Sequence, residues 1–170
     1  LKHVDMDALK KGVPNLLKHL ENMQAYGLTP ICALNRFETD ADEEISYVGD
    51  AVKELGIETS DVQIWAKGGD GGTELAEMVV SATAKPSTGH FLYETDTPLT
   101  DKIEKISSAI YGADGVRYPA SVQKKIKALE AQGFGRLPVC IAKTQNSLSD
   151  QATLRGRPEG FIITVNDLRV

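Results

Sequence analysis

The sequence has little of what several classes of protein require. It contains two cysteines and three histidines in 170 residues, and no run of Lys or Arg is longer than two. A small secreted domain would use more cysteines as disulfides, and His3 and His19 have no companions at metal-ligand spacing. The lack of clustered basic residues and a net charge of −5 disfavour a nucleic-acid partner. We therefore expect no metal site and no nucleic-acid ligand.

Long apolar runs are also missing. No apolar segment approaches the roughly 20 residues of a membrane-spanning helix, and no signal-peptide pattern opens the chain. Cys32 and Cys140 each lie in a short apolar run, so we expect two buried, reduced thiols in a cytoplasmic protein. The chain does not begin with Met, and Val170 closes an apolar segment without a helix cap. We interpret it as part of a longer polypeptide.

The sequence instead alternates short apolar runs with amphipathic stretches. Helical spacing of apolar residues predicts a helix over about 4–26. The run at 30–34 predicts a strand buried on both faces, a helix then extends to about Leu55, and 62–66 predicts a second strand. Strand, crossover helix and strand form a βαβ unit, in which the strands are almost always parallel. Another helix is predicted over about 73–84.

A change of composition predicts where the chain divides. The segment KPSTGHFLYETDTP, with its prolines and polar residues, suggests a linker over 86–98. We expect residues 1–85 to form one helix plus the βαβ unit. Residues 99–170 are expected to form a smaller α/β subdomain, with strands at 137–142 and 161–165.

Two aromatic residues mark the candidate binding site. Phe37 follows the first predicted strand and Trp65 ends the second, so both should emerge at the carboxyl edge of the sheet, where open α/β sheets bind ligands. With Arg36 and Lys67 beside them, they suit a flat heteroaromatic ligand that carries negative charge. Alternatively, each ring packs under a neighbouring loop.

A glycine-rich loop, Gly68-Gly69-Asp70-Gly71-Gly72, follows Lys67 between the second strand and the next helix. Backbone N–H groups and a helix dipole favour an anion at such a place. The glycine spacing matches neither the dinucleotide fingerprint nor the P-loop, and Asp70 would oppose a phosphate. The loop either approaches a ligand closely or is a permissive turn. Spacing alone assembles no catalytic residues and no metal ligands elsewhere in the chain.

Five segments resemble the formate–tetrahydrofolate ligase family, also called 10-formyltetrahydrofolate synthetase, in its order and spacing. They are LNRFETD (34–40), WAKGGDGG (65–72), YGADGV (111–116), LPVCIAKTQNSLSD (137–150) and GFIITVNDLRV (160–170). The resemblance implies a cytoplasmic homotetramer that makes 10-formyltetrahydrofolate from formate, tetrahydrofolate and MgATP through formyl phosphate, helped by a monovalent cation. It implies that Phe37 and Trp65 hold the pteridine ring. Bordering this slot would be Asn35, Arg36, Lys67, Gly68 and Gly69.

The family's P-loop and its formate-binding residues lie in an N-terminal part that this chain lacks. The resemblance therefore implies a central to C-terminal fragment: a parallel βαβ-type three-layer unit, part of a P-loop-NTPase-like sheet, followed by the smaller subdomain. We expect this fragment to supply the pteridine slot, to be inactive alone and to carry no bound cofactor. Two alternatives stay open. The chain could be a non-catalytic module for packing and oligomerisation, or it could contact adenine through Asn35 as part of a nucleotide-binding domain.

Overall fold

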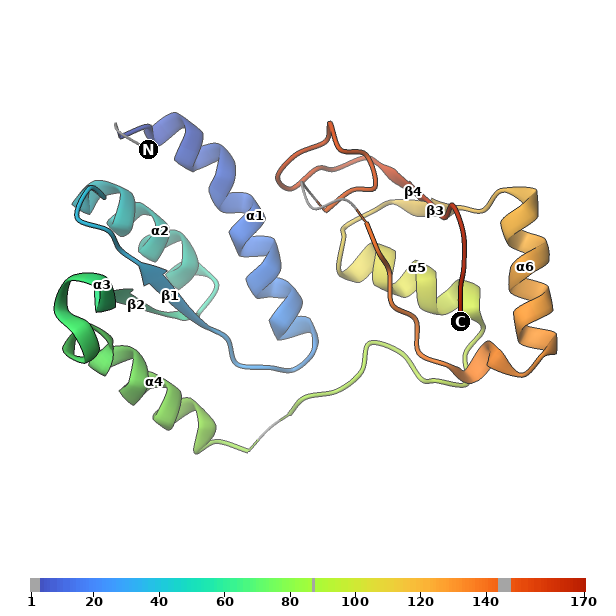
Figure 1. Cartoon of the computed structure of the whole chain (residues 1–170), viewed down its shortest axis with the longest axis horizontal. Helices are drawn as coiled ribbons and strands as arrows, with labels where there is room; N and C mark the ends of the chain where they lie inside the picture. Colours follow the sequence, from blue (N-terminus) through green and yellow to red (C-terminus); the bar gives the residue numbers. More distant parts are fainter. Residues whose placement is uncertain (1–3, 87, 144–147) are drawn as a thin grey trace. The chain divides into compact units, whose positions relative to one another are not determined.

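The computed structural model describes residues 4–86, 88–143 and 148–170. The chain is α/β and divides into two compact units, Leu1–His90 and Phe91–Val170. Each unit has its own two-stranded parallel sheet (Figure 1). The expected α/β class with parallel strands is confirmed, whereas the wider three-layer sheet of P-loop type stays a prediction. No helix in the described parts of the chain is long and apolar enough to cross a membrane.

The first unit contains the expected βαβ arrangement (Figure 1). After α1 (Met6–Ala25), the chain enters β1 (Ile31–Asn35), crosses over through α2 (Asp42–Glu54) and returns in β2 (Glu58–Val62). The strands are parallel, with Ile31 opposite Glu58 and Asn35 opposite Val62. The buried core of this unit joins α1, β1 and α2, and its residues are Leu20, Cys32, Val52 and Ile57.

The predicted second strand at 62–66 is wrong beyond Val62. The strand is β2, and Ile64–Lys67 instead form the short helix α3, followed by the 3-10 helix η1 (Gly68–Gly72) and by α4 (Thr73–Thr83). Ser60 can occupy the buried middle of β2 because its hydroxyl donates to Glu74 Oε2 at 2.7 Å. A tertiary contact thus allows a polar segment to form the strand, while the apolar run leaves the core.

The second unit is built on two helices and a short sheet. It comprises α5 (Leu99–Ala109), β3 (Gly115–Arg117), α6 (Ala120–Ala131), the 3-10 helix η2 (Phe134–Arg136) and β4 (Ile162–Thr164), with β3 parallel to β4. Among the described residues of this unit, two small clusters of buried side chains form the core. They consist of Leu99, Val122 and Ile126, and of Ala113, Phe161 and Ile163.

Two further expectations, a strand at 137–142 and a buried Cys140, are corrected. This segment, described throughout, forms no strand. The N–H of Val139 donates to the hydroxyl of Tyr93 at 2.9 Å, so a side chain takes the place of a sheet partner. Cys140 is exposed rather than buried, whereas Cys32 is buried as expected.

A buried lysine ties three segments of the second unit together. Lys102 on α5 has no exposed surface, and its Nζ donates to the carbonyl oxygens of Thr95 and Gly135 at 2.6 Å and of Leu137 at 3.1 Å. An ammonium group has three N–H donors. The three carbonyls therefore satisfy it fully, and the buried charge is compensated by peptide dipoles.

Candidate functional site

The candidate site lies at the carboxyl ends of β1 and β2. The N–H of Arg36 donates to the carbonyl of Val62 at 2.9 Å, which extends the pairing one residue beyond β1. Phe37 follows directly, and Trp65 lies on α3 just after β2. Because the strands are parallel, both segments leave the sheet at the same end. Both rings are accessible, Phe37 being 49% and Trp65 72% exposed.

Arg36 is engaged by acidic side chains of the protein itself. Its Nη1 donates to Asp61 Oδ2 at 3.0 Å, and its Nη2 pairs with Asp42 Oδ1. The hydrogen bonds to Asp42 and then to Asp61 raise the pKa of Arg36. The charge of this guanidinium is thus matched within the protein, so Arg36 links the end of β1 to β2 and to the start of α2.

The segment that carries Phe37 is a tight turn. The N–H of Phe37 donates to Asp40 Oδ2 at 2.9 Å, and the carbonyl of Phe37 accepts from the N–H of Asp40 at 3.0 Å. Asp40 also accepts from Arg36 Nη2 through its backbone carbonyl at 3.5 Å. These bonds fix the backbone at Phe37 while its side chain stays exposed.

The segment that carries Trp65 closes on itself. The carbonyl of Gln63 accepts from the N–H groups of Ala66 at 3.1 Å and Lys67 at 2.9 Å, and the N–H of Gln63 donates to the carbonyl of Gly71 at 3.0 Å. The glycine-rich stretch is therefore a compact 3-10 turn. Lys67 is exposed at its start.

A match to a known protein family supplements this geometry. A family model described as formate–tetrahydrofolate ligase matches residues 1–170. The chain belongs to the formate–tetrahydrofolate ligase family. The resemblance stated from the sequence is confirmed, and with it the class of enzyme: a ligase of folate one-carbon metabolism that joins formate to tetrahydrofolate using ATP.

In this formate–tetrahydrofolate ligase chain, the predicted site residues lie at one end of one sheet. They belong to two segments, one at the end of β1 and one after β2. Asn35 is the last residue of β1 and is exposed. The other four border residues lie beside the two rings in sequence, namely Arg36, Lys67, Gly68 and Gly69. Among the described residues, no group of three His, Cys, Asp or Glu side chains is placed to hold a metal ion.

Sequence reasoning missed the residues that support the site. Asp61 accepts from both Arg36 and Gln63 Nε2, the latter at 3.3 Å, and so connects the two ring-bearing segments. It was missed because the predicted strand, 62–66, begins four residues after β2 does and does not include Asp61. The sequence of this strand, ETSDV, contains one apolar residue and so gives no local signal of a buried strand.

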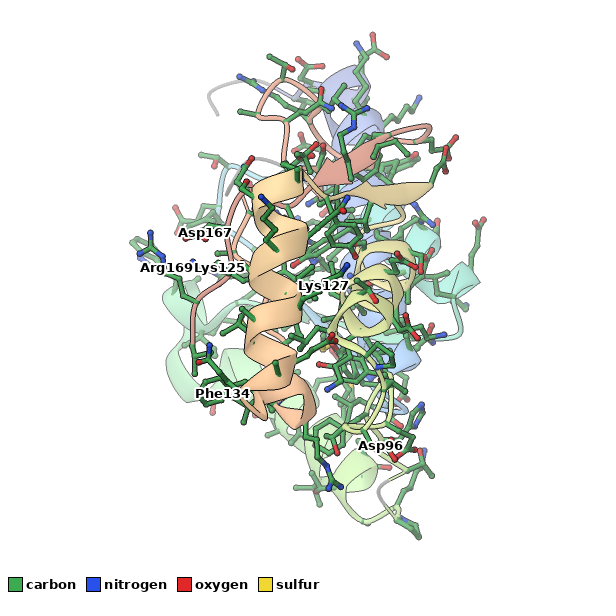
Figure 2. All side chains as sticks on the ribbon, turned by 90° about the vertical axis from the view of Figure 1, so that its right-hand side faces the viewer. Asp96, Lys125, Lys127, Phe134, Asp167 and Arg169 are labelled. Carbon is green, nitrogen blue, oxygen red and sulfur yellow. The ribbon has the colours of Figure 1, made fainter. Side chains whose placement is uncertain are left out.

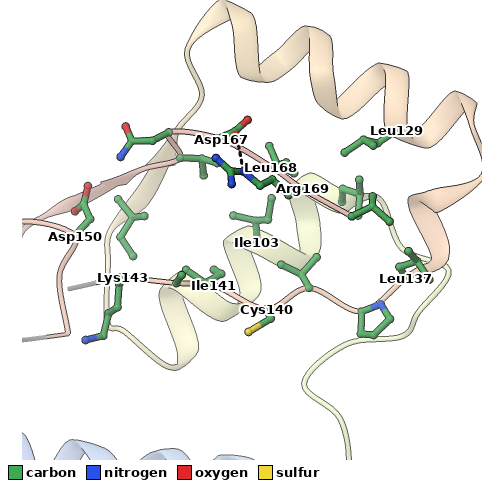
Figure 3. Close-up of a pocket in the computed structure, with 18 of the residues that line it drawn as sticks. Ile103, Leu129, Leu137, Cys140, Ile141, Lys143, Asp150, Asp167, Leu168 and Arg169 are labelled. Atoms are coloured by element: carbon green, nitrogen blue, oxygen red, sulfur yellow. Dashed lines mark hydrogen bonds and ion pairs between the residues drawn. The ribbon is translucent and has the colours of Figure 1, made fainter. Parts of the chain in front are cut away.

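The second unit contains an apolar cavity that the sequence did not predict. Its volume is about 960 Å³, and it lies between α5, residues 137–143 and the C-terminal segment (Figure 3). At its rim, Asp167 accepts from Lys125 Nζ of α6 at 2.7 Å and from Arg169 Nε at 3.2 Å (Figure 2). Neither Phe37 nor Trp65 lines this cavity, so it is separate from the candidate slot.

Proposed function

We propose that this chain supplies the pteridine-binding slot of a formate–tetrahydrofolate ligase, with Phe37 and Trp65 stacking on the ring of tetrahydrofolate. One observation carries the proposal: two exposed aromatic residues stand on hydrogen-bonded turns that leave two paired parallel strands at the same end. Exposed rings on a fixed backbone are suited to a flat ligand, because little backbone entropy is lost when the ligand binds.

Stacking would serve the reaction by positioning. Holding the pteridine fixes where the N10 amine of tetrahydrofolate meets formyl phosphate, which makes an intermolecular step effectively intramolecular. Lys67 is exposed beside the slot and would face the folate carboxylates or the phosphate. Arg36 would act differently, since its charge is matched by Asp42 and Asp61; it would hold the slot in place. Asn35, Gly68 and Gly69 would form its border.

MgATP does not fit the residues described here, and the family's monovalent cation stays a prediction. The 170 residues contain no G-x-x-x-x-G-K-S/T motif, and the described part of the chain offers no cluster of metal-binding side chains. No step is therefore assigned to these groups. We infer that the chain alone does not make formyl phosphate. Cytoplasmic location and assembly as a homotetramer stay predictions from the family.

Binding measurements on three variants test the slot. Removing either ring, in Phe37→Ala or Trp65→Ala, is expected to weaken tetrahydrofolate binding by about 1 kcal/mol beyond the lost burial, or at least roughly fivefold. Phe91→Ala is the matched control, because Phe91 is also exposed but belongs to the second unit. Isothermal titration calorimetry gives the three dissociation constants. Equal affinities for all variants would refute the assignment.

A packing or oligomerisation role is the second candidate, and one observation favours it. Helix α4 has no fully buried residue, and its Val79 and Val80 are exposed, as expected if another protein surface covers them. This role is compatible with the slot. Sedimentation analysis of Val80→Asp tests it: a change in assembly state with unchanged folate affinity would support the packing role and leave the slot proposal intact.

A further inference from the structure

We propose that Gly71 is a positioning residue, which sets the place of Trp65 by packing its backbone against the peptide of Gln63. The inference rests on the proposed function, in which Trp65 stacks on the pteridine. It assigns a specific task to the glycine-rich loop, which resembles a phosphate-binding loop only in composition.

The contact at Gly71 leaves no room for a side chain. A Cβ atom at this position would lie 2.4 Å from the carbonyl oxygen of Gln63, 2.5 Å from its carbonyl carbon and 2.8 Å from the nitrogen of Ile64. All three are backbone atoms, so no rotamer change relieves the overlap. The same approach allows the N–H of Gln63 to donate to the carbonyl of Gly71 at 3.0 Å.

The contact reaches Trp65 through the first turn of α3. The carbonyl of Gln63 accepts from the N–H groups of Ala66 and Lys67, so a shift of the Gln63 peptide carries the turn that bears Trp65 with it. The chain is anchored on either side of this loop, because β2 is paired with β1 and Glu74 of α4 is bonded to the buried Ser60. Neither α3 nor η1 has a buried residue. A side chain at position 71 would therefore displace these two short helices rather than the anchored elements.

The neighbouring glycines provide a graded comparison. At Gly69 an added Cβ would meet nothing within 4 Å. At Gly72 it would meet only the end of the flexible Ile64 side chain, at 3.0 Å from Cδ1 and 3.1 Å from Cγ1. None of Gly69, Gly71 and Gly72 has a positive φ, whereas Gly68 has a φ of 59° and needs glycine for that reason as well. Alanine at the first three positions therefore differs mainly in the contact it makes.

The test compares Gly69→Ala, Gly72→Ala and Gly71→Ala in the whole chain. Trp65 is the only tryptophan, so its emission maximum and its quenching by acrylamide report its surroundings without any ligand. We expect Gly69→Ala to leave the Trp65 emission unchanged, Gly72→Ala to shift it slightly, and Gly71→Ala to shift it most and to weaken tetrahydrofolate binding about tenfold or more. Urea unfolding of each variant separates a displaced ring from general destabilisation.

Several results would overturn the inference. Unchanged Trp65 emission and affinity in a folded Gly71→Ala variant would do so, as would equal emission shifts in Gly69→Ala and Gly71→Ala, or lower stability with native emission and affinity. If Gly71→Ala does not fold, Gly72→Ala decides: a Trp65 emission identical to that of Gly69→Ala would refute the role. Failure of the unmodified chain to bind tetrahydrofolate would instead refute the proposed function, while the emission series would still test Gly71.

Discussion

Asp61 is the residue on which the two halves of the candidate slot depend. It accepts from Arg36 at the end of β1 and from Gln63 at the start of the Trp65 loop. A charged acceptor shared by two donors fixes their relative positions better than either bond alone. Aromatic slot residues can therefore stay exposed while the backbone beneath them is held.

The two cysteines are expected to differ in reactivity. Cys32 is buried, and its burial raises the pKa of its thiol, whereas Cys140 is exposed. Because the thiolate is the reactive form, brief treatment with N-ethylmaleimide should add one group to the folded chain, at Cys140, and two in denaturant. Peptide mass spectrometry locates the adducts. Modification of Cys32 at the rate of Cys140 in the folded chain would contradict the burial described here.

Among the elements, α5 depends on an unusual interaction, the buried Lys102 ammonium. Lys102→Met keeps most of the side-chain volume but leaves three carbonyls without a donor. At about 1 kcal/mol for each unpaired acceptor, the free energy of unfolding should fall by about 3 kcal/mol. Lys105→Met is the control, on the same helix but exposed, and should have little effect. Urea unfolding gives both values, and equal losses would show that the three carbonyl contacts do not stabilise the unit.

The link between α6 and the C-terminal segment should depend on pH. Hydrogen bonds from Lys125, and then from Arg169 and the backbone of Leu168, lower the pKa of Asp167 to about 2. An unfolded Asp titrates near about 3.9, so the stability that Asp167 contributes is present above that pH and is lost as the pH falls through about 2.

Carbon-detected NMR can follow the Asp167 carboxylate directly. Lys125→Met should raise its pKa towards the ordinary value, whereas Lys127→Met should not, because Lys127 is exposed on the same helix (Figure 2) and is not among the groups that shift the pKa of Asp167. An unchanged titration in Lys125→Met would contradict the ion pair as the cause.

Helices and the βαβ order followed from local patterns, because side chains such as Val52 recur at helical spacing and are buried where expected. The position of β2 did not, since its burial depends on Glu74, which lies 14 residues beyond Ser60. Lys102 was missed for a related reason: a lysine is polar in any pattern, and only tertiary structure brings three carbonyls to it. The placement of Phe37 and Trp65 at the same end of the sheet could be predicted, because parallel strands share a carboxyl edge even when one strand boundary is misplaced. Their role in binding stays a prediction.

For the whole molecule, the family's reaction requires ATP, whereas the residues of this chain suggest only folate binding. The family joins formate to tetrahydrofolate, yet the 170 residues lack a P-loop sequence. We expect no ATP-dependent formation of 10-formyltetrahydrofolate by this chain alone, measured as the absorbance of the acid-converted product. Turnover above that of a heat-denatured sample would contradict this expectation.

The most direct test of the central claim is a titration of the unmodified chain with tetrahydrofolate, followed through the emission of Trp65. Trp65 is the only tryptophan, so a stacked pteridine must quench it. We predict saturable quenching that is weakened in Phe37→Ala and unchanged in Phe91→Ala. Emission that stays constant while calorimetry detects bound tetrahydrofolate, or the absence of any binding, would contradict the pteridine slot.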